Sequence, residues 1–324
     1  MFTYTTLSRR CLMGAALAAC TLAAPALADE AYPSRPVSII VPFAAGGTTD
    51  AIARLVAEEL QTRWGKAVVV ENKPGAGGVI ATQAVSRAKP DGTQILFNDI
   101  SLALNEVTVA SLPYDLNKDL RPVVAVGDWP LGVMVAADAG INTLPELIER
   151  AKTENISFGT FGPASSPHLA AELLNSLAGI KMKIVHFKGV SPVTQAMASG
   201  EVQVGVFGAG AAAGEVAKGT MKVLALDYKS PLMPEVPTYA EAGLEGMRSL
   251  AWWGVFVPSA TPDTIVSEIN AGVNDALKSP RITEYLEKNG YTMVGGAPEA
   301  LQQRVDDAVA LWGPLAEQAG IKAK

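Results

Sequence analysis

The sequence predicts an α/β protein built from mostly parallel sheets that are flanked by helices. Two observations carry this prediction. From Val37 onward, short runs of β-branched residues alternate with segments of helical periodicity. Glycine-rich turns separate several of these strands from the helix that follows. The chain has 324 residues, of which 49% are hydrophobic, so it can bury the cores of two domains.

The first series of strands and helices ends near residue 98. The helix expected at residues 50–60 places Ile52, Val56 and Leu60 on one face, which is the spacing of a helix that covers a sheet. The expected strands are residues 37–42, 67–71 and 94–98, and the expected helices are residues 50–60 and 79–89. This βαβαβ order is typical of parallel strands joined by helical crossovers.

A second series follows a strand pair at residues 123–126 and 131–136. It contains helices at 144–152, 167–177 and 192–199, strands at 156–159, 183–187, 202–207 and 223–226, and a short alanine-rich helix between the last two strands. The chain ends with a strand at 252–257 and helices at 263–278, 280–289 and 298–319. Because these last helices need a sheet to cover, we expect the chain to form a second domain and then return to the first.

The first 28 residues have the pattern of a secretory signal peptide. Arg9 and Arg10 precede an apolar stretch at residues 11–24, and a small-residue cleavage pattern ends at Ala28. The apolar stretch is too short to span a membrane as a helix. We therefore expect an exported protein, sent out by the general or the twin-arginine route and cut after Ala28. The alternative is a lipoprotein anchored at Cys20.

The charge pattern excludes some classes of partner. The formal net charge is −6 and no run of Lys and Arg occurs, which argues against nucleic acid and anionic membrane surfaces. His168 and His186 are the only histidines, and neither stands in a cluster of His, Cys and acidic residues with metal-ligand spacing. We therefore expect neither a metal nor a cofactor.

Three loops share one design, since each ends an expected strand and opens a helix with Gly, Ser or Thr. They are residues 43–50, 159–168 and 188–192. A helix start leaves backbone N–H groups unpaired and carries a partial positive charge, and glycine lets a ligand approach closely. A carboxylate fits such a place without an arginine. The alternative is that these are ordinary helix starts, as Ser166-Pro167 and Ser191-Pro192 would be.

Several longer motifs occur along the chain. The most specific are Val41-Pro42-Phe43 followed by Gly46-Gly47 and Asp50, and the block at residues 70–78. Further motifs are Pro90-Asp91-Gly92, Ser166-Pro167-His168-Leu169 with Glu172, Phe187-Lys188-Gly189 with Pro192, Val236-Pro237-Thr238 with Glu241 and Gly243, and Trp253-Gly254 with Pro258. In these motifs the chain resembles the solute receptors of tripartite tricarboxylate transporters, periplasmic binding proteins also called Bug proteins.

The resemblance implies a two-domain Venus-flytrap fold, with residues 29–130 and 252–324 in one domain and residues 131–251 in the other. It implies a periplasmic receptor rather than an enzyme. Such a receptor captures a small carboxylate, an organic acid or an acidic amino acid, and delivers it to an integral-membrane permease. Family receptors of this size are usually monomers. The ligand-binding residues that the resemblance assigns are Phe43, Gly46, Gly47, Thr48 and Asp50 on one jaw, Ser165, Ser166 and His168 on the other, and Gly189 and Gly208 along the cleft.

Several roles stay open at this point. Asp50 would repel an anion, so it either meets an ammonium, a water or a protonated group, or caps its own helix. His168 either contacts the ligand or makes a local helix contact, and Trp252-Trp253 either stacks on a ligand or packs in the core. Two segments depart from the family pattern. One is Asn98-Asp99-Ile100, where family members usually hold small hydroxyl residues, and the other is Gly162-Pro163-Ala164. These departures leave the identity of the ligand open.

Two enzymatic alternatives are weaker. Residues 208–213 follow an expected strand and are followed by Asp227, which mimics a dinucleotide fingerprint, but the intervening helix is short and interrupted by glycine. Ser165 or Ser166 with His168 suggests a serine hydrolase. However, the chain has no G-x-S-x-G motif, and His168 lies on the same helix turn as the serines.

Overall fold

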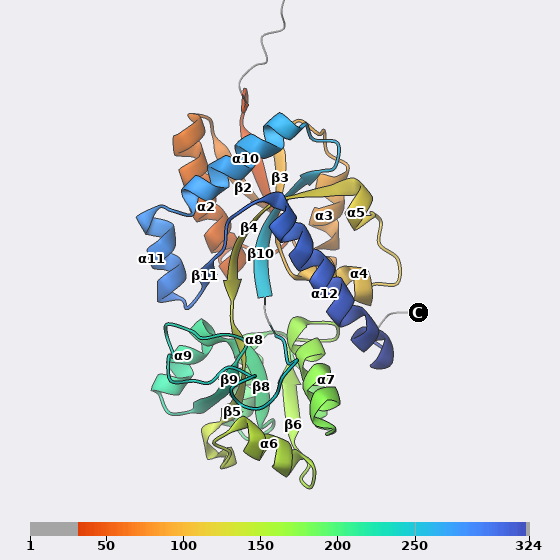
Figure 1. Ribbon diagram of the computed structural model, residues 1–324, viewed down its shortest axis with the longest axis vertical. Coiled ribbons are helices and arrows are strands. Elements are labelled where there is room, and N and C mark those ends of the chain that lie inside the picture. Colours follow the sequence, from red (N-terminus) through yellow and green to blue (C-terminus); the bar gives the residue numbers. More distant parts are fainter. Residues whose placement is uncertain (1–31, 250, 322–324) are drawn as a thin grey trace, which may run out of the picture.

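The computed structural model describes residues 32–249 and 251–321, which form two lobes stacked along the long axis of the molecule (Figure 1). One lobe contains a six-stranded sheet in the order β11-β4-β10-β3-β1-β2, and the other a five-stranded sheet in the order β7-β6-β8-β5-β9. Helices flank both sheets, so the predicted α/β class is confirmed. The signal peptide expected at residues 1–28, with Cys11 and Cys20, lies outside the described residues.

The centre of the first lobe is β1 (Val37–Val41), which lies between β2 (Val68–Asn72) and β3 (Gln94–Asp99) and is parallel to both. Successive side chains of a strand point to opposite faces of the sheet. Accordingly, Ile39 packs into the apolar cluster on one face and Ile40 into the cluster on the other. Burial on both faces explains why β1 is almost continuously apolar.

Helices cover both faces of the first sheet. The Ile39 face is covered by α2 (Thr48–Trp64), α10 (Asp263–Ala276) and α11 (Pro280–Lys288). The Ile40 face is covered by α3 (Val79–Ser86), α4 (Ser101–Thr108) and α12 (Pro298–Gln318). The short helices η1 (Ala76–Gly78) and α5 (Leu116–Asp119) lie in the connections.

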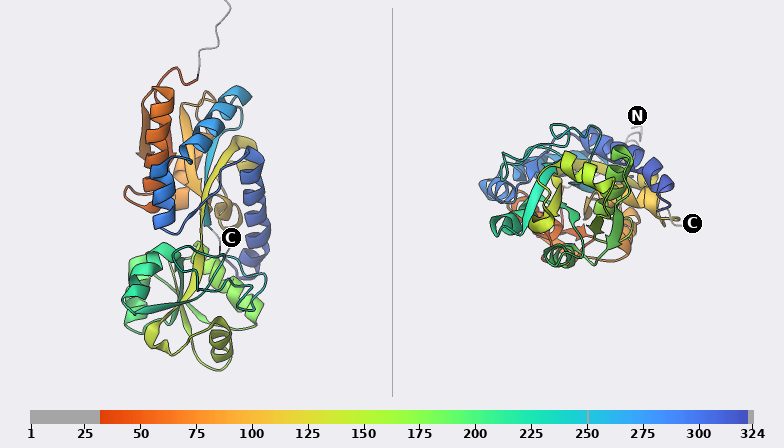
Figure 2. Two further views of the ribbon diagram at one scale, coloured as in Figure 1. Left: turned by 60° about the vertical axis from the view of Figure 1, so that its left-hand side comes forward. Right: turned by 90° about the horizontal axis from the view of Figure 1, so that it is seen from below.

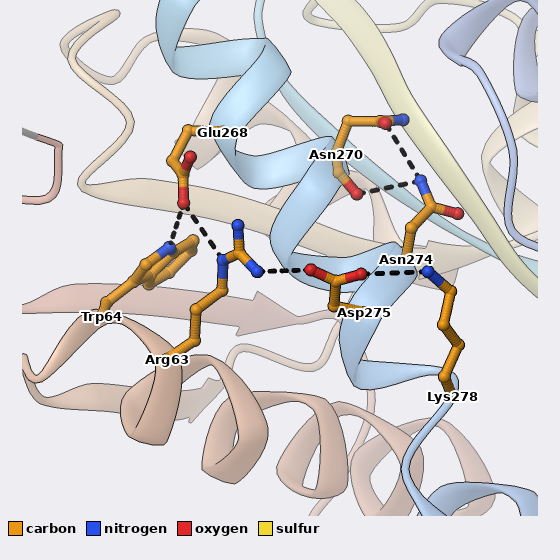
Figure 3. A network of polar contacts seen from close by, with 7 residues as sticks. All are labelled: Arg63, Trp64, Glu268, Asn270, Asn274, Asp275 and Lys278. Atoms are coloured by element: carbon orange, nitrogen blue, oxygen red, sulfur yellow. Dashed lines mark hydrogen bonds and ion pairs between the residues drawn. The ribbon is translucent and has the colours of Figure 1, made fainter.

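Polar contacts fasten the C-terminal end of α2 to α10 (Figure 3). Trp64 donates its indole N–H to Glu268 at 3.0 Å, and Arg63 forms ion pairs with Glu268 and Asp275. These contacts hold the C-terminal end of α2 against α10.

The first sheet is completed by strands that run against their neighbours. β10 (Ala251–Pro258) lies between β3 and β4 (Leu120–Trp129) and is antiparallel to both, and β11 (Thr292–Met293) is antiparallel to β4. The sheets are therefore mixed, which corrects the prediction of mostly parallel ones. The physical reason is that β4 leaves the lobe and β10 re-enters it, so these two strands run in opposite directions.

The second lobe begins at β5 (Leu131–Ala136), which Pro130 alone separates from β4. β5 is antiparallel to β8 (Val204–Gly208) and β9 (Met221–Leu226), whereas β6 (Ser157–Thr160) is parallel to β7 (Lys183–His186) and β8. The helices of this lobe are η2 (Ala137–Ala139), α6 (Leu144–Ala151), α7 (Ser166–Ala178), α8 (Val190–Ala198) and α9 (Ala209–Ala217).

α12 connects the two lobes along one side of the molecule (Figures 1 and 2). It contacts β4 and α4 in the first lobe and α7 in the second. Trp312 and Leu315 of α12 share one buried apolar cluster with Leu169 and Leu173 of α7. Within residues 32–249 and 251–321, no helix combines the length and apolar character that a membrane span requires.

The strand pairings show which ends of the strands meet at the junction of the lobes. Trp129 and Leu131 mark this junction, since they end β4 and begin β5. β10 starts beside Trp129 and β3 is antiparallel to β10, so β3 and its parallel neighbour β1 end toward the junction. Gly208 pairs with Leu131, so β8 also ends there, and so do its parallel neighbour β6 and β7, which is parallel to β6. The loops that open α2, α7, α8 and α9 therefore converge on the space between the lobes.

Candidate functional site

The first loop presents a helix start to the junction. α2 begins at Gly47 with no side-chain cap, and the backbone at Gly46 takes a positive φ of +83°. Gly46, Gly47 and Thr48 are exposed, whereas Thr49 and Asp50 are buried below them. The first N–H groups of α2 therefore lie at an accessible surface, where an anion can accept hydrogen bonds from them.

Asp50 supports this loop from its buried side. Its carboxylate accepts hydrogen bonds from the Gly46 N–H at 2.9 Å, from Asn72 Nδ2 at 2.8 Å and from Arg54 Nε at 2.9 Å. Burial alone would raise the pKa of Asp50, but these hydrogen bonds and the charge of Arg54 outweigh it and lower the pKa. Both oxygens of Asp50 are thus occupied within the protein. Of its two expected roles, this favours holding its own helix start.

Two residues that stabilise the loop were not among the predicted site residues. Asn72 also donates to the carbonyl of Phe43 at 3.0 Å, and Arg54 Nη2 donates to Asn72 Oδ1 at 3.0 Å. The side chain of Phe43 is half-buried against the core beneath α2. The spacing of Asp50 and Arg54, four residues apart on one helix face, was a signal for their ion pair. The contribution of Asn72 arises only when β2 pairs with β1.

The second loop opens α7, and its two serines differ in their hydrogen bonding. Ser165 caps α7: its hydroxyl accepts from the His168 N–H at 3.4 Å and donates to the carbonyl of Gly162 at 2.7 Å. The Ser166 hydroxyl is buried and has no hydrogen-bond partner among the described residues. A buried hydroxyl without a partner is unfavourable unless another molecule supplies one.

His168 holds the turn that precedes α7. Its Nδ1 accepts a hydrogen bond from the Ala164 N–H at 3.0 Å, and Ala164 has a positive φ of +61°. Because Nδ1 is an acceptor, the ring proton of the neutral form lies on Nε2, which is 3.8 Å from Glu172 Oε1. Burial and the neighbouring His186 lower the pKa of His168 to about 4. His168 is therefore a neutral residue that shapes the turn, which favours the local-contact role.

The starts of α8 and α9 also lack side-chain caps. Gly189 begins α8 with φ +109°, a conformation that disfavours other residues, and no atom lies within 4 Å of the place where a Cβ would stand. Gly208 begins α9, and a Cβ there would lie 3.6 Å from Trp129 Cδ1. Gly189 thus borders open space, whereas Gly208 packs at the junction itself.

A pair of tryptophans connects the first jaw with the second lobe. The indole N–H of Trp253 donates to the Thr49 hydroxyl at 3.0 Å, and its ring lies against that of Trp129, with centroids 3.9 Å apart. Trp129 in turn faces Gly208. The start of α2 and the start of α9 are therefore linked through two aromatic rings. Trp252 and Trp253 are both buried, which favours core packing over ligand stacking.

The geometry argues against the two enzymatic alternatives. β8 and β9 are separated in the sheet by β5, so they are not the adjacent parallel strands of a dinucleotide-binding unit, and Asp227 accepts a hydrogen bond from the Ser249 N–H at 3.0 Å. The hydroxyl of Ser165 donates to Gly162 rather than to His168. Among the described residues, no group of three or more His, Cys, Asp and Glu side chains is placed to hold a metal ion.

Comparisons with known proteins point to one family. Residues 52–321 match the model of the tripartite tricarboxylate transporter family receptor. The chain is 34% identical over 312 residues to the UPF0065 protein of the tcbD-tcbE intergenic region of Pseudomonas sp. strain P51, covering 95% of this chain and 93% of that one. The solved structure of the periplasmic binding protein BugD is 31% identical, with a TM-score of 0.76 over 90% of this chain and 100% of its own. Rpa4515 of R. palustris, solved with adipate, is 30% identical, with a TM-score of 0.78 over 89% of this chain and 98% of its own.

Proposed function

The chain belongs to the tripartite tricarboxylate transporter family of receptors, and on this premise we propose that its two lobes close on a small carboxylate at their junction. The family consists of periplasmic solute-binding receptors, not enzymes. The proposal assigns the carboxylate to the space between the starts of α2 and α7, with the starts of α8 and α9 beside it.

One observation supports this proposal above the others. Helix starts without side-chain caps lie on loops of both lobes that end at the same junction: the N-terminus of α2 on one side, and the N-terminus of α8 on the other. Hydrogen bonds to a charged group contribute about 1.5–3 kcal/mol each. A few such bonds from both lobes are enough for micromolar affinity, which corresponds to about −8 kcal/mol. The adipate held by Rpa4515 is a ligand of this chemical type.

We propose further that the two lobes act as the domains of a flytrap. The hinge would lie where the chain passes between them, at Pro130 and at the start of β10. Because the donors lie on opposite lobes, a carboxylate would interact with both sets only when the lobes approach, so it would favour the closed state. In the periplasm, an integral-membrane permease would then recognise the closed receptor.

The proposal is tested by measuring binding to sets of molecules that differ only in charge. The mature protein is titrated with adipate, succinate and citrate, and with adipamide and 1,6-hexanediol as uncharged counterparts, by calorimetry and thermal unfolding. We expect at least one acid to bind. At 100 times its Kd it would stabilise the fold by about 2.7 kcal/mol. Equal binding of the diamide or the diol, or binding of no carboxylate in a wider panel, would contradict the proposal.

A further inference from the structure

The side chain of Asp99 lies at the junction, beside the proposed carboxylate site. Asp99 is the last residue of β3 and stands directly opposite Trp253 of β10. Residues paired in this way point to the same face of an antiparallel sheet. Trp253 points to the α2 face, where its indole N–H bonds Thr49 in the first turn of α2. Asp99 is therefore on the same face as the start of α2, at the end of β3 that is directed toward the second lobe.

The carboxylate of Asp99 is not neutralised by the protein. Its Oδ1 accepts from the Ser101 N–H at 2.9 Å, and the other groups that stabilise its charge, the Ser101 hydroxyl and its own N–H, are likewise neutral. Within the described residues, Asp99 takes part in none of the ion pairs formed by Lys, Arg or His, and its partner across the sheet is an indole ring. Burial raises the pKa of Asp99 to about 6 despite these hydrogen bonds.

Asp50, the acidic residue in the first turn of α2, is in a different situation. Asp50 is paired with Arg54 and bonded by Asn72, so its charge is balanced within the first jaw. Asp99 has no such cationic partner among the described residues, so its negative charge is available to a ligand in the cleft. A ligand with a carboxylate at each end would place one of its charges near Asp99, in a partly desolvated site where like charges repel strongly. A ligand with a cationic nitrogen at that end would instead supply the missing charge.

We propose that Asp99 makes this receptor select carboxylates that also carry a cationic nitrogen, so that the helix starts bind the anionic end and Asp99 the cationic end. The inference rests on the proposed function, because it needs a carboxylate at the junction. It narrows the ligand from carboxylates in general to amino-carboxylates. A counter-charge from the protein itself would have to come from the other lobe, where Lys188 is exposed just before Gly189.

The test uses ligand pairs of equal chain length in which an ammonium replaces one carboxylate. These are succinate with 4-aminobutyrate, glutarate with 5-aminopentanoate, and adipate with 6-aminohexanoate, together with aspartate and glutamate as α-amino acids. Calorimetry is performed on the wild type, Asp99→Asn and Lys188→Met. Asparagine keeps an oxygen for the Ser101 N–H, so this variant changes the charge and can keep that hydrogen bond.

For at least one pair or α-amino acid, we expect the wild type to bind the amino-carboxylate about 10-fold or more tighter than the matching dicarboxylate. In Asp99→Asn this ratio should fall by a similar factor, and Lys188→Met should keep it. Carboxylate binding with a ratio that Asp99→Asn does not change would overturn the inference and leave the proposed function intact. So would a wild-type preference for the dicarboxylate in every pair, or a Lys188→Met variant that loses the preference as Asp99→Asn does. Absence of binding by every acid and amino acid would overturn both.

Discussion

The indole N–H of Trp253 donates a hydrogen bond to the hydroxyl of Thr49 at 3.0 Å, and both side chains are buried. Trp253 lies in β10, the strand that returns from the second lobe, and Thr49 lies in the first turn of α2. One hydrogen bond therefore fixes the start of α2 to a strand that begins at the junction of the two lobes. The ring of Trp253 extends this connection to Trp129, at the other chain crossing.

We predict that Trp253→Phe destabilises the protein by about 1–3 kcal/mol, because the Thr49 hydroxyl is left buried without its donor. Ligand affinity should also fall, since the start of α2 is no longer fixed. Urea unfolding and calorimetry measure the two effects. Trp64→Phe is the matched control, because its indole bonds Glu268 at the far end of α2. That variant should keep wild-type affinity, and equal binding losses in both variants would contradict the account.

The adjacent serines of α7 should separate stability from binding. Ser165→Ala removes the helix cap and should lower the free energy of unfolding by about 1 kcal/mol. Ser166→Ala removes a buried hydroxyl that has no partner, so stability should stay the same or rise slightly, while carboxylate affinity falls. Urea unfolding and calorimetry on the two variants check this. If Ser166→Ala bound ligand like the wild type, Ser166 would be no part of the site.

His168 should make stability depend on pH in the mildly acidic range. Its pKa is lowered from the ordinary 6.5 to about 4 by burial and by His186. Between these values the unfolded chain binds a proton that the folded chain does not. Acidification through this range therefore lowers the free energy of unfolding, and the loss ends near pH 4. His168→Asn keeps an acceptor for the Ala164 N–H and should flatten the pH profile relative to the wild type. Profiles of equal slope would show that His168 is not the group responsible.

Asp99 should have the opposite dependence. Burial raises its pKa from the ordinary 3.8 to about 6, so the folded state holds the proton more tightly than the unfolded chain. Stability attributable to this group is present at low pH and is lost as the pH rises between these two values. Asp99→Asn should therefore be more stable than the wild type at neutral pH and nearly equal to it below the lower value. Reduced stability of the variant at neutral pH would contradict this description of the carboxyl environment.

Much of this architecture could be predicted from local patterns, and some of it could not. The apolar run of β1 and the helical spacing of Ile52, Val56 and Leu60 correctly indicated a buried strand and a covering helix. The direction of β4 and β10 depends on which lobe the chain comes from, and no local pattern encodes that. α4 was not predicted, because Ser101 follows β3 after only Ile100, with no Gly or Pro to mark the change.

The candidate site, like the fold, could be predicted from the sequence only in part. Glycine-rich loops indicated which helix starts face the junction, because backbone donors need no particular side chain. The Ser165 hydroxyl donates to the carbonyl of Gly162 in a turn where Gly162 and Ala164 both have positive φ, and no local sequence pattern predicted that turn. The state of Asp50 depends on Asn72, a residue of the neighbouring strand. Contacts made through sheet pairing and backbone strain had to be seen in the structure.

The central claim is that the uncapped start of α2 binds the carboxylate, and calorimetry on Gly47→Val tests it most directly. A Cβ at Gly47 would meet only the Ala44 carbonyl oxygen, at 3.6 Å, and the backbone there is extended, so the variant should fold. Ala297→Val is the matched control, because Ala297 begins α12 in a similar backbone conformation. We predict that Gly47→Val loses carboxylate affinity by at least about 10-fold, or about 1.4 kcal/mol, while Ala297→Val binds normally. Wild-type affinity in a folded Gly47→Val protein would contradict the account.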